Sequence, residues 1–253
     1  MRILLDDSRV MLKVGSRNQT AELVEAYIID HGLLPGDKLP SEREMCEMWG
    51  LNRMTLRNAL KRLSNLGIVE SRASLGMFVA PPKMVRNLQD TIGFSQAVRE
   101  AGRVPGHRVI GCELIEANKF VVRHLRVILA SPTFVIKRVN TIDGHPVAVE
   151  TSWINAQHCK GIEAYDFSTA SLYGVLEDRY GIIPTSGTEK ISVTKVDEEE
   201  ADLLGVRGGD SAFFQTGLIL DQHERPVEYF KNVVLPSRIS FSTELRRMTT
   251  SEA

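Results

Sequence analysis

The sequence lacks the features that mark membrane-spanning, disulfide-rich and metal-binding proteins. No apolar run approaches the roughly 18 residues that a transmembrane helix requires. The three cysteines are widely spaced and form no Cys-x-x-Cys pair, which argues against a disulfide framework and a zinc site. The histidines show no metal-ligand spacing either. We therefore expect no metal, no cofactor and a reducing, cytoplasmic environment.

The sequence also has no excess of positive charge. It holds 31 lysines and arginines against 32 aspartates and glutamates, a net charge of −1. This balance disfavours a protein that coats DNA by charge alone, although a local cationic face would suffice for a specific DNA reader. The 253 residues allow one large domain or two ordinary ones. Acidic residues at positions 6 and 7 come too early for a signal peptide.

Three helix-start signals occur in the first quarter of the chain. Two are capping boxes, in which a serine precedes a glutamine or glutamate by three residues, and the third is an asparagine suited to an N-cap. A glycine follows each predicted helix as a stop signal. The helices are expected to begin near Arg17, Ser41 and Asn52 and to end before Gly32, Gly50 and Gly67.

A β-hairpin is predicted directly after the third helix. Residues 68–72 and 77–80 are two short β-type runs, and residues 73–76 form the turn between them. Three helices followed by a hairpin predict a winged helix-turn-helix domain over residues 16–80.

The third predicted helix has an apolar side and a cationic side. On a helical wheel Leu56 shares its side with other apolar residues, and Arg57 and Lys61 lie opposite. Five cations stand against two acidic residues between positions 43 and 62. In DNA-binding helix-turn-helix proteins the first turn of this helix enters the major groove, where arginine can pair with guanine. A solvated basic face and a protein-binding helix-turn-helix are the alternatives.

The rest of the chain alternates strand signals with short helices, which predicts an α+β domain with one antiparallel sheet. Asp143-Gly144 predicts a tight hairpin. A weak repeat at a spacing of about 80 residues suggests two similar halves. Strands are expected near residues 108–114, 134–141, 146–154, 187–196, 211–220 and 226–234, and helices near residues 118–125, 170–180 and 198–204.

These signals set the expected domain limits. Residues 1–15 form a lead-in, and the winged helix-turn-helix follows at 16–80. The proline pair Pro81-Pro82 suits neither a strand nor a helix interior, so it opens a predicted linker over 81–93. The second domain is expected over 94–248.

Residues 34–44, Leu-Pro-Gly-Asp-Lys-Leu-Pro-Ser-Glu-Arg-Glu, and residues 52–57, Asn-Arg-Met-Thr-Leu-Arg, resemble a known family. They are similar to the signature and the recognition-helix start of the GntR family of bacterial repressors. The resemblance implies a cytoplasmic, nucleoid-associated homodimer on double-stranded palindromic operator DNA, with recognition helices about 10 base pairs apart. The residues implied at the DNA are Ser41, Arg43, Asn52, Arg53, Thr55, Arg57, Lys61 and Gly76.

The predicted hairpin departs from that family. GntR proteins usually carry a basic hairpin tip with two glycines, whereas Ser74 and Leu75 precede a single Gly76 here. Met77 stands in place of a usual threonine. The sequence therefore leaves open whether this wing contacts DNA.

The second region resembles the UTRA effector domain of the HutC subfamily. Its landmarks include Gly93-Phe94-Ser95, Gly144-His145-Pro146-Val147 and Arg225-Pro226-Val227-Glu228-Tyr229. The resemblance implies a chorismate-lyase-like fold, dimerisation and a small-molecule effector such as a sugar, a sugar phosphate or a related metabolite. The implied effector-binding residues are Phe94, Ser95, Arg138, Asn140, Glu150, Ser171, Tyr173 and Glu228.

One of these positions differs from relatives that bind phosphorylated sugars. Those relatives carry Arg-x-Arg on a central strand, whereas this chain has Arg138 followed by Asn140. One guanidinium in place of two weakens the case for a dianionic phosphate. Two further points stay open. Glu150 and Glu228 lie near predicted strand ends, where acidic residues are often exposed, and Arg138 could face solvent as easily as a pocket.

The sequence predicts a transcriptional regulator, usually a repressor in this family, whose affinity for its operator a small molecule controls. The alternative is an enzyme resembling chorismate lyase, because an Arg–Glu pocket could perform acid–base chemistry. No nucleophile–base pair is recognisable in the sequence, and a DNA-binding domain has no purpose in a plain lyase. The sequence names neither the effector nor the direction of its effect on DNA binding.

Overall fold

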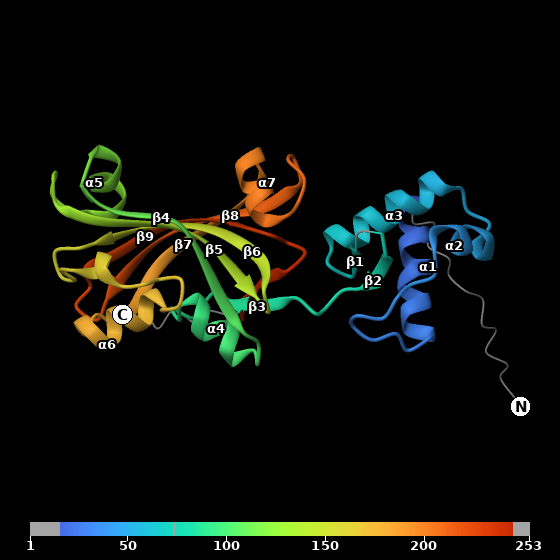
Figure 1. Cartoon of the computed structure of the whole chain (residues 1–253), viewed down its shortest axis with the longest axis horizontal. Helices are drawn as coiled ribbons and strands as arrows, with labels where there is room; N and C mark the ends of the chain where they lie inside the picture. Colours follow the sequence, from blue (N-terminus) through green and yellow to red (C-terminus); the bar gives the residue numbers. More distant parts are fainter. Residues whose placement is uncertain (1–15, 73, 245–253) are drawn as a thin grey trace, which may run out of the picture. The chain divides into compact units, whose positions relative to one another are not determined.

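The structure, a computed structural model, describes residues 16–72 and 74–244 (Figure 1). The chain divides into two units, residues 1–82 and residues 83–253. The predicted lead-in and the last four residues of the predicted second domain lie outside the described ranges. No helix within those ranges is long and apolar enough to cross a lipid bilayer.

Unit 1 is a winged helix-turn-helix, as the sequence predicts. Its elements are α1 (Ser16–Asp30), α2 (Glu42–Trp49), α3 (Arg53–Asn65), β1 (Val69–Arg72) and β2 (Gly76–Val79). The three helices pack around fully buried side chains that include Val24, Met45 and Leu56. β1 and β2 form an antiparallel hairpin that closes this core through Val69.

Side-chain caps fix where the two helices of the helix-turn-helix begin. Ser41 Oγ accepts a hydrogen bond from the Glu44 backbone at 3.2 Å, and the Glu44 carboxylate accepts one from the Ser41 backbone at 2.7 Å. Asn52 Oδ1 accepts from the backbone N–H and the hydroxyl of Thr55. A cap of this kind contributes about 1 kcal/mol. The third predicted cap, Ser16, lies outside the described side chains.

Unit 2 is built on a six-stranded antiparallel sheet. Its strands are β4 (Pro105–Glu116), β5 (Pro132–Ile142), β6 (His145–Asn155), β7 (Pro184–Lys195), β8 (Ser211–Asp221) and β9 (Pro226–Val234). They lie in the order β4-β5-β6-β9-β8-β7, so the second half of the sheet repeats the first in reverse about the β6–β9 pair. The weak sequence repeat therefore corresponds to two structural halves. The β5–β6 hairpin turns at Asp143-Gly144, both at positive φ, as predicted.

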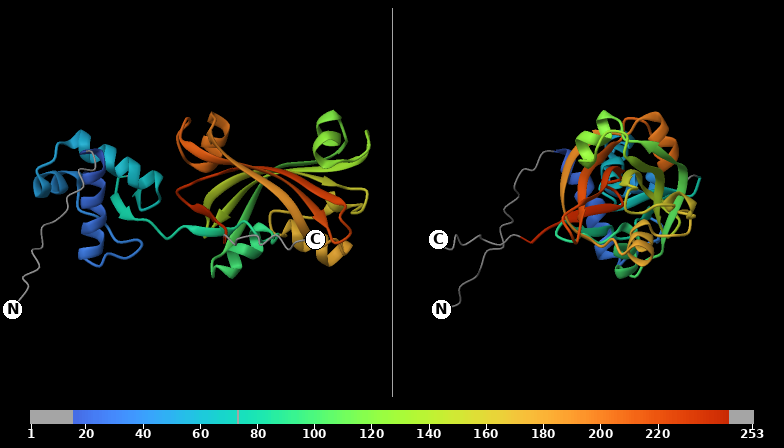
Figure 2. Two further views of the ribbon diagram at one scale, coloured as in Figure 1. Left: turned by 180° about the vertical axis from the view of Figure 1, so that it is seen from behind. Right: turned by 90° about the vertical axis from the view of Figure 1, so that its left-hand side faces the viewer.

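Helices cover both faces of this sheet (Figures 1 and 2). α5 (Lys119–Leu125) and α7 (Glu198–Leu204) lie on one face, and α4 (Phe94–Glu100) and α6 (Leu172–Tyr180) lie on the other. Val139 and Val149 pack in one cluster with the side chains of α7. Because neighbouring residues of a strand point to opposite faces, Arg138 and Glu150 face the side of α4 and α6.

Part of the predicted linker has regular structure. Within 81–93, residues 84–87 form β3 (Met84–Asn87), which pairs in parallel with β10 (Ile239–Ser242) near the end of the chain. Met84 and Ile239 are both buried, in a cluster that also includes Val98 of α4. Residues 81–83 and 88–93 of the predicted linker lie outside helices and strands. Local sequence patterns missed this strand because its partner lies far away in the sequence.

The start of α6 also differs from the prediction. The sequence analysis expects Thr169 to cap a helix from Ala170, whereas α6 begins at Leu172 and Ser171 is its N-cap. Ser171 Oγ accepts from the Gly174 backbone N–H at 3.3 Å. The Thr169 hydroxyl instead donates to the Asp166 carbonyl in the preceding turn. α4 was not predicted, because its N-cap, Gly93, makes no side-chain cap.

Candidate functional site

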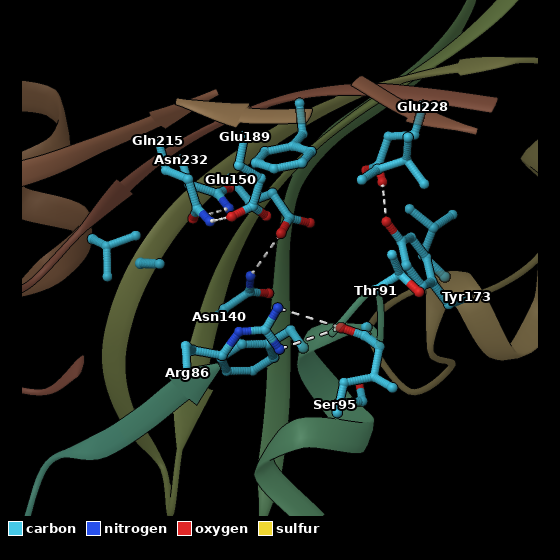
Figure 3. Close-up of a pocket in the computed structure, with 18 of the residues that line it drawn as sticks. Arg86, Thr91, Ser95, Asn140, Glu150, Tyr173, Glu189, Gln215, Glu228 and Asn232 are labelled. Carbon is cyan, nitrogen blue, oxygen red and sulfur yellow. Dashed lines mark hydrogen bonds between the residues drawn. The ribbon is translucent and has the colours of Figure 1, made fainter. Parts of the chain in front are cut away.

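A pocket of about 140 Å³ lies on the face of the sheet that carries α4 and α6 (Figure 3). Side chains of the central strands β5, β6, β9 and β8 form its floor, and residues between Arg86 and Ser95 form one wall. The pocket lining includes all eight residues that the sequence analysis assigned to an effector: Phe94, Ser95, Arg138, Asn140, Glu150, Ser171, Tyr173 and Glu228.

Four polar side chains stand in a row across the floor of the pocket. Arg138 on β5 is opposite Glu150 on β6. Asn232 on β9 is opposite Glu150, and Gln215 on β8 is opposite Asn232. Opposed residues of neighbouring strands project from the same face. Since buried sheet positions are usually apolar, a polar row of this length is typical of a binding site.

Arg138 and Glu150 form a buried ion pair. Arg138 Nη2 donates to Glu150 Oε1, and the two side chains are only 5% and 11% exposed. Burial raises the pKa of Glu150, but the charge and hydrogen bond of Arg138 outweigh burial and leave this pKa below its ordinary value. Nε and Nη1 of Arg138 are buried without a hydrogen-bond partner among the described residues. A buried N–H group without a partner costs about 1–3 kcal/mol, so a ligand that places an acceptor atom beside Arg138 would be favoured.

A hydrogen-bonded chain connects α4 to the ion pair. Ser95 Oγ lies 2.7 Å from His107 Nε2, and His107 Nδ1 lies 2.8 Å from Asn140 Oδ1. Asn140 Nδ2 donates to Glu150 at 3.2 Å (Figure 3). Since Asn140 Oδ1 can only accept, His107 carries its proton on Nδ1, and Nε2 accepts from Ser95. Burial and the charge of Arg138 lower the pKa of His107, which keeps the ring neutral near pH 7.

Glu228 is a buried carboxyl with a tyrosine partner. The Tyr173 hydroxyl donates to Glu228 Oε2 at 2.7 Å (Figure 3). Burial and, next, the charge of Glu150 raise the pKa of Glu228 to about 7. No ion pair among the described residues includes Glu228. Its carboxylate is therefore not neutralised by a cation of the protein.

Tyr173 also contacts the chain that leads into α4. A β-carbon built at Gly93 would lie 3.0–3.2 Å from three atoms of the Tyr173 side chain. The absence of a side chain at residue 93 lets the backbone approach this closely. A single aromatic side chain therefore touches Gly93 and hydrogen-bonds Glu228 of the pocket.

Seven polar residues of the pocket were not predicted from the sequence. Gln215 Nε2 donates to Glu189 at 2.9 Å, and Asn232 Nδ2 donates to Gln215 at 3.3 Å. Gln215 and Asn232 could have been found from the sequence, because each stands at a strand position where the alternating pattern predicts an apolar residue. The other missed residues come from β3, the segment between β3 and α4, β4 and β7, and the seven are Arg86, Asp90, Thr91, His107, Glu189, Gln215 and Asn232.

Burial decides the two points that the sequence left open. As whole residues, Glu150 and Glu228 are 8% and 3% exposed, so neither is an exposed residue at a strand end. Arg138 is 4% exposed and faces the pocket rather than solvent. All three lie on the central strands β5, β6 and β9, and the order of strands in a sheet cannot be read from alternation within one strand.

In unit 1, the residues predicted to bind DNA divide into exposed cations and helix-capping residues. The cations are exposed on α2 and α3, and they are Arg43, Arg53, Arg57 and Lys61. Ser41, Asn52 and Thr55 take part in the helix caps described above. These three residues therefore set the starts of α2 and α3 and with them the positions of the cations.

Two of these cations form exposed ion pairs within unit 1. Arg43 Nε lies 2.9 Å from Glu47, and Arg57 Nε lies 2.8 Å from Glu42. Such exposed pairs contribute about 0–1 kcal/mol, so a stronger anionic partner can replace them. Neither pair was predicted from the sequence, and Arg57 and Glu42 are 15 residues apart on different helices, so no spacing pattern within one helix relates them.

The hairpin of unit 1 places the last predicted DNA-binding residue, Gly76, at the start of β2. Its φ of 111° is a left-handed conformation that favours glycine. The opposite residue is Arg72, whose guanidinium carbon lies 4.2 Å from the centroid of the Phe78 ring. The hairpin thus does carry a cation near its tip, held against its own surface.

Comparisons with known proteins identify both units. Residues 16–79 match the family described as bacterial regulatory proteins, gntR family, and residues 100–240 match the UTRA domain. The chain belongs to the GntR family. The HTH-type transcriptional repressor NagR of Bacillus subtilis is 30% identical over 232 residues, which cover 91% of this chain and 95% of NagR.

A second relative of this GntR protein also has a solved structure. The HTH-type transcriptional repressor PhnF of Mycolicibacterium smegmatis is 30% identical over 83% of this chain and 85% of PhnF. The crystal structure of PhnF from Mycobacterium smegmatis matches with a TM-score of 0.64 at 28% identity, over 90% of this chain and 99% of that chain. The protein is therefore a GntR-type, DNA-binding transcriptional regulator with a UTRA domain, as the resemblance implied.

The raised pKa of Glu228 predicts a stability change with pH. Folding favours the protonated carboxyl, so the free energy of unfolding falls as pH rises from the unfolded pKa of about 4.5 through the folded pKa of about 7. Glu228→Gln removes this loss. We expect the variant to gain about 3 kcal/mol over the wild type between about pH 4.5 and pH 8. Urea unfolding of both proteins across this range measures the gain.

The matched control is Glu189→Gln, which removes an exposed carboxyl from the same pocket. Solvent screens the charge at this position, so this variant should follow the wild type within about 0.5 kcal/mol. Parallel pH profiles for wild type and Glu228→Gln would contradict the assigned protonation of Glu228.

Proposed function

We propose that this protein is a one-component transcriptional repressor that binds a palindromic operator as a homodimer and is controlled by a small molecule in the unit 2 pocket. Family membership supports the DNA-binding part, and the printed names of NagR and PhnF, both transcriptional repressors, support the direction of control. The structure adds support for a link between the pocket and the DNA-binding unit.

The observation that carries the proposal is the composition of the pocket wall. Pocket-lining residues between Arg86 and Ser95 follow unit 1 directly in the chain. A ligand in the pocket would therefore touch the segment through which unit 1 is attached. A ligand shifts an equilibrium only when its contacts differ between two states, and its contacts to this wall would differ if the segment changed position.

Tyr173 offers a specific route for this coupling. A ligand that competes for Glu228 would release the Tyr173 hydroxyl, and the Tyr173 ring packs on Gly93. A displacement of the Tyr173 ring would therefore shift the backbone at the start of α4. Gly93 is the N-cap of α4, and α4 shares a buried cluster with β3 and β10.

Two features support a dimer. A palindromic operator matches a protein with two-fold symmetry, with the two α3 helices in successive major grooves. The edge strands β4 and β7 are 12 residues long, and most of their side chains are exposed. Long uncovered sheet edges invite pairing with another chain, which here would be a second copy.

The DNA-reading role predicts different effects for two arginines. If Arg57 reads a guanine, Arg57→Ala should cost about 1–3 kcal/mol on the operator and much less on random DNA. Arg43→Ala is the matched control, because we expect Arg43 to contact a phosphate. Loss of a phosphate contact should weaken binding to operator and to random DNA equally, and should lower the number of counterions released on binding by about one. Fluorescence anisotropy with duplexes selected from a random pool measures both.

Selection itself tests the palindrome, since the enriched duplexes should carry two inverted half-sites about 10 base pairs apart. Equal losses of affinity for operator and random DNA in Arg57→Ala would show that Arg57 contacts a phosphate rather than a base. Enrichment of a single, asymmetric half-site would contradict the symmetric dimer.

The proposed coupling predicts an effect of Gly93→Ala. A methyl group at residue 93 would press on the Tyr173 ring, so we expect effector affinity to fall about ten-fold and release of DNA by effector to weaken. Gly111→Ala on β4 is the control, because a β-carbon there meets no atom within 4 Å. Operator affinity with and without ligand is measured for both variants. Identical behaviour of the two alanines would argue against a route through Tyr173.

An enzymatic role has one observation in its favour. Ser95, His107 and Asn140 have the connectivity of a nucleophile, a base and an orienting group. However, Ser95 is buried and the chain ends on the Arg138–Glu150 pair, where it has a clear structural role. Hydrolysis of nitrophenyl esters that disappears in Ser95→Ala would favour the enzyme.

A further inference from the structure

The charges that line the pocket are unbalanced. Two guanidinium groups, of Arg86 and Arg138, face four carboxyl groups, and these belong to Asp90, Glu150, Glu189 and Glu228. Arg138 is already paired with Glu150. Both terminal nitrogens of Arg86 donate to the Ile92 carbonyl at 3.3 Å. The side chains of the pocket therefore include more carboxyl groups than cationic groups to neutralise them.

The donors at the α4 end of the pocket are already engaged. The Ser95 hydroxyl donates to His107, His107 donates to Asn140, and the Asn140 amide donates to the Glu150 carboxylate. Every donor in this chain thus points toward another protein atom, and the chain ends on a negative charge. A phosphate dianion placed here would have to break the chain and would lie close to Glu150.

Polar groups that the protein leaves without a cation or without a hydrogen-bond partner define what a ligand must bring. Glu228 is buried without a cation, and Asn232 Oδ1 is buried without a donor among the described residues. Both call for a hydrogen-bond donor, and a carboxylate in a buried site gains most from a cationic donor. Nε and Nη1 of Arg138 call for an oxygen acceptor. The required ligand therefore combines a cationic donor with an acceptor oxygen.

We propose that the effector is a primary amine that also carries hydroxyl or carboxylate oxygens, and that it is not a phosphate ester. Its ammonium group lies at Glu228, and an oxygen accepts from Arg138. Amino sugars and amino acids share this chemistry. This inference rests on the proposed effector role of the pocket and names the class of ligand for it.

The inference has a pH signature that any bound amine should show. The groups facing Glu228 are Glu150 and Ser152 from β6, Tyr173 from α6 and Arg138 from β5. The side chains of His107, Arg86, Glu189 and Asp90 line the same pocket. An ammonium group requires Glu228 to be ionised, so binding releases a proton when Glu228 starts protonated. For an amine that stays charged, affinity should be about ten-fold weaker at pH 6 than at pH 8.

The experiment is a thermal-shift screen of the full-length protein with matched compounds. One series is glucosamine, glucose and glucose 6-phosphate, the other is serine, glycerate and 3-phosphoglycerate, and a wider metabolite library follows. Compounds that stabilise the protein are titrated by calorimetry at about pH 6 and pH 8, and then tested for release of the selected operator. We expect the stabilising compounds to carry an amine, and the two series separate amino sugars from amino acids.

Two variants check the placement of the amine. Glu228→Gln should weaken binding of the amine at least ten-fold and abolish its pH dependence. Glu177→Gln, which removes an exposed carboxyl of α6 away from the pocket lining, should change affinity less than three-fold. The melting temperature without ligand shows whether each variant is folded. The pH dependence of the wild type gives the same test without any substitution.

The possible outcomes separate the inference from the proposed function. Stabilisation by phosphate esters or neutral sugars that lack an amine, unaffected by Glu228→Gln, would overturn the amine inference alone. Amines that bind at Glu228 without changing operator affinity would uphold the inference and overturn the effector role. A library in which no compound stabilises the protein would count against both.

Discussion

The buried ion pair between Arg138 and Glu150 is the constraint on which the pocket depends. Two charges out of water are stable only when they are paired and their remaining groups are hydrogen-bonded. Asn140 supplies one such bond to Glu150, and through His107 the network reaches Ser95 on α4. The pair leaves two guanidinium donors unused. It therefore holds the sheet and α4 together and still presents a recognition group.

The first residues of unit 2, which follow unit 1 in the chain, give this network its importance for regulation. β3 pairs with β10, Gly93 packs on Tyr173 and Ser95 bonds to His107, so the start of unit 2 is fixed to the rest of that unit at three places. All three places include residues that line the pocket, because β3 and β10 contribute Arg86 and Ile239 to it. A ligand that rearranges Tyr173 or the hydrogen-bonded chain would act on this segment without needing a long pathway.

Features that depend on residues close together in the sequence were predicted, whereas features that depend on distant residues were missed. The helix starts at Ser41 and Asn52 depend on residues three positions away, and they were predicted correctly. β3 was missed because it pairs with a strand at the far end of the chain. In the pocket, the family resemblance supplied Arg138 and Glu228, but His107 and Glu189 enter through sheet order and tertiary packing, which no local pattern encodes.

Reciprocal linkage is the most direct test of the central claim that the pocket controls the DNA-binding unit. If a pocket ligand weakens operator binding by a given factor, saturating operator must weaken ligand binding by the same factor. Calorimetric titration of the ligand into the full-length protein, with and without operator duplex, measures this. The account predicts a lower ligand affinity in the presence of operator and equal factors in both directions. The same ligand affinity with and without operator would contradict it.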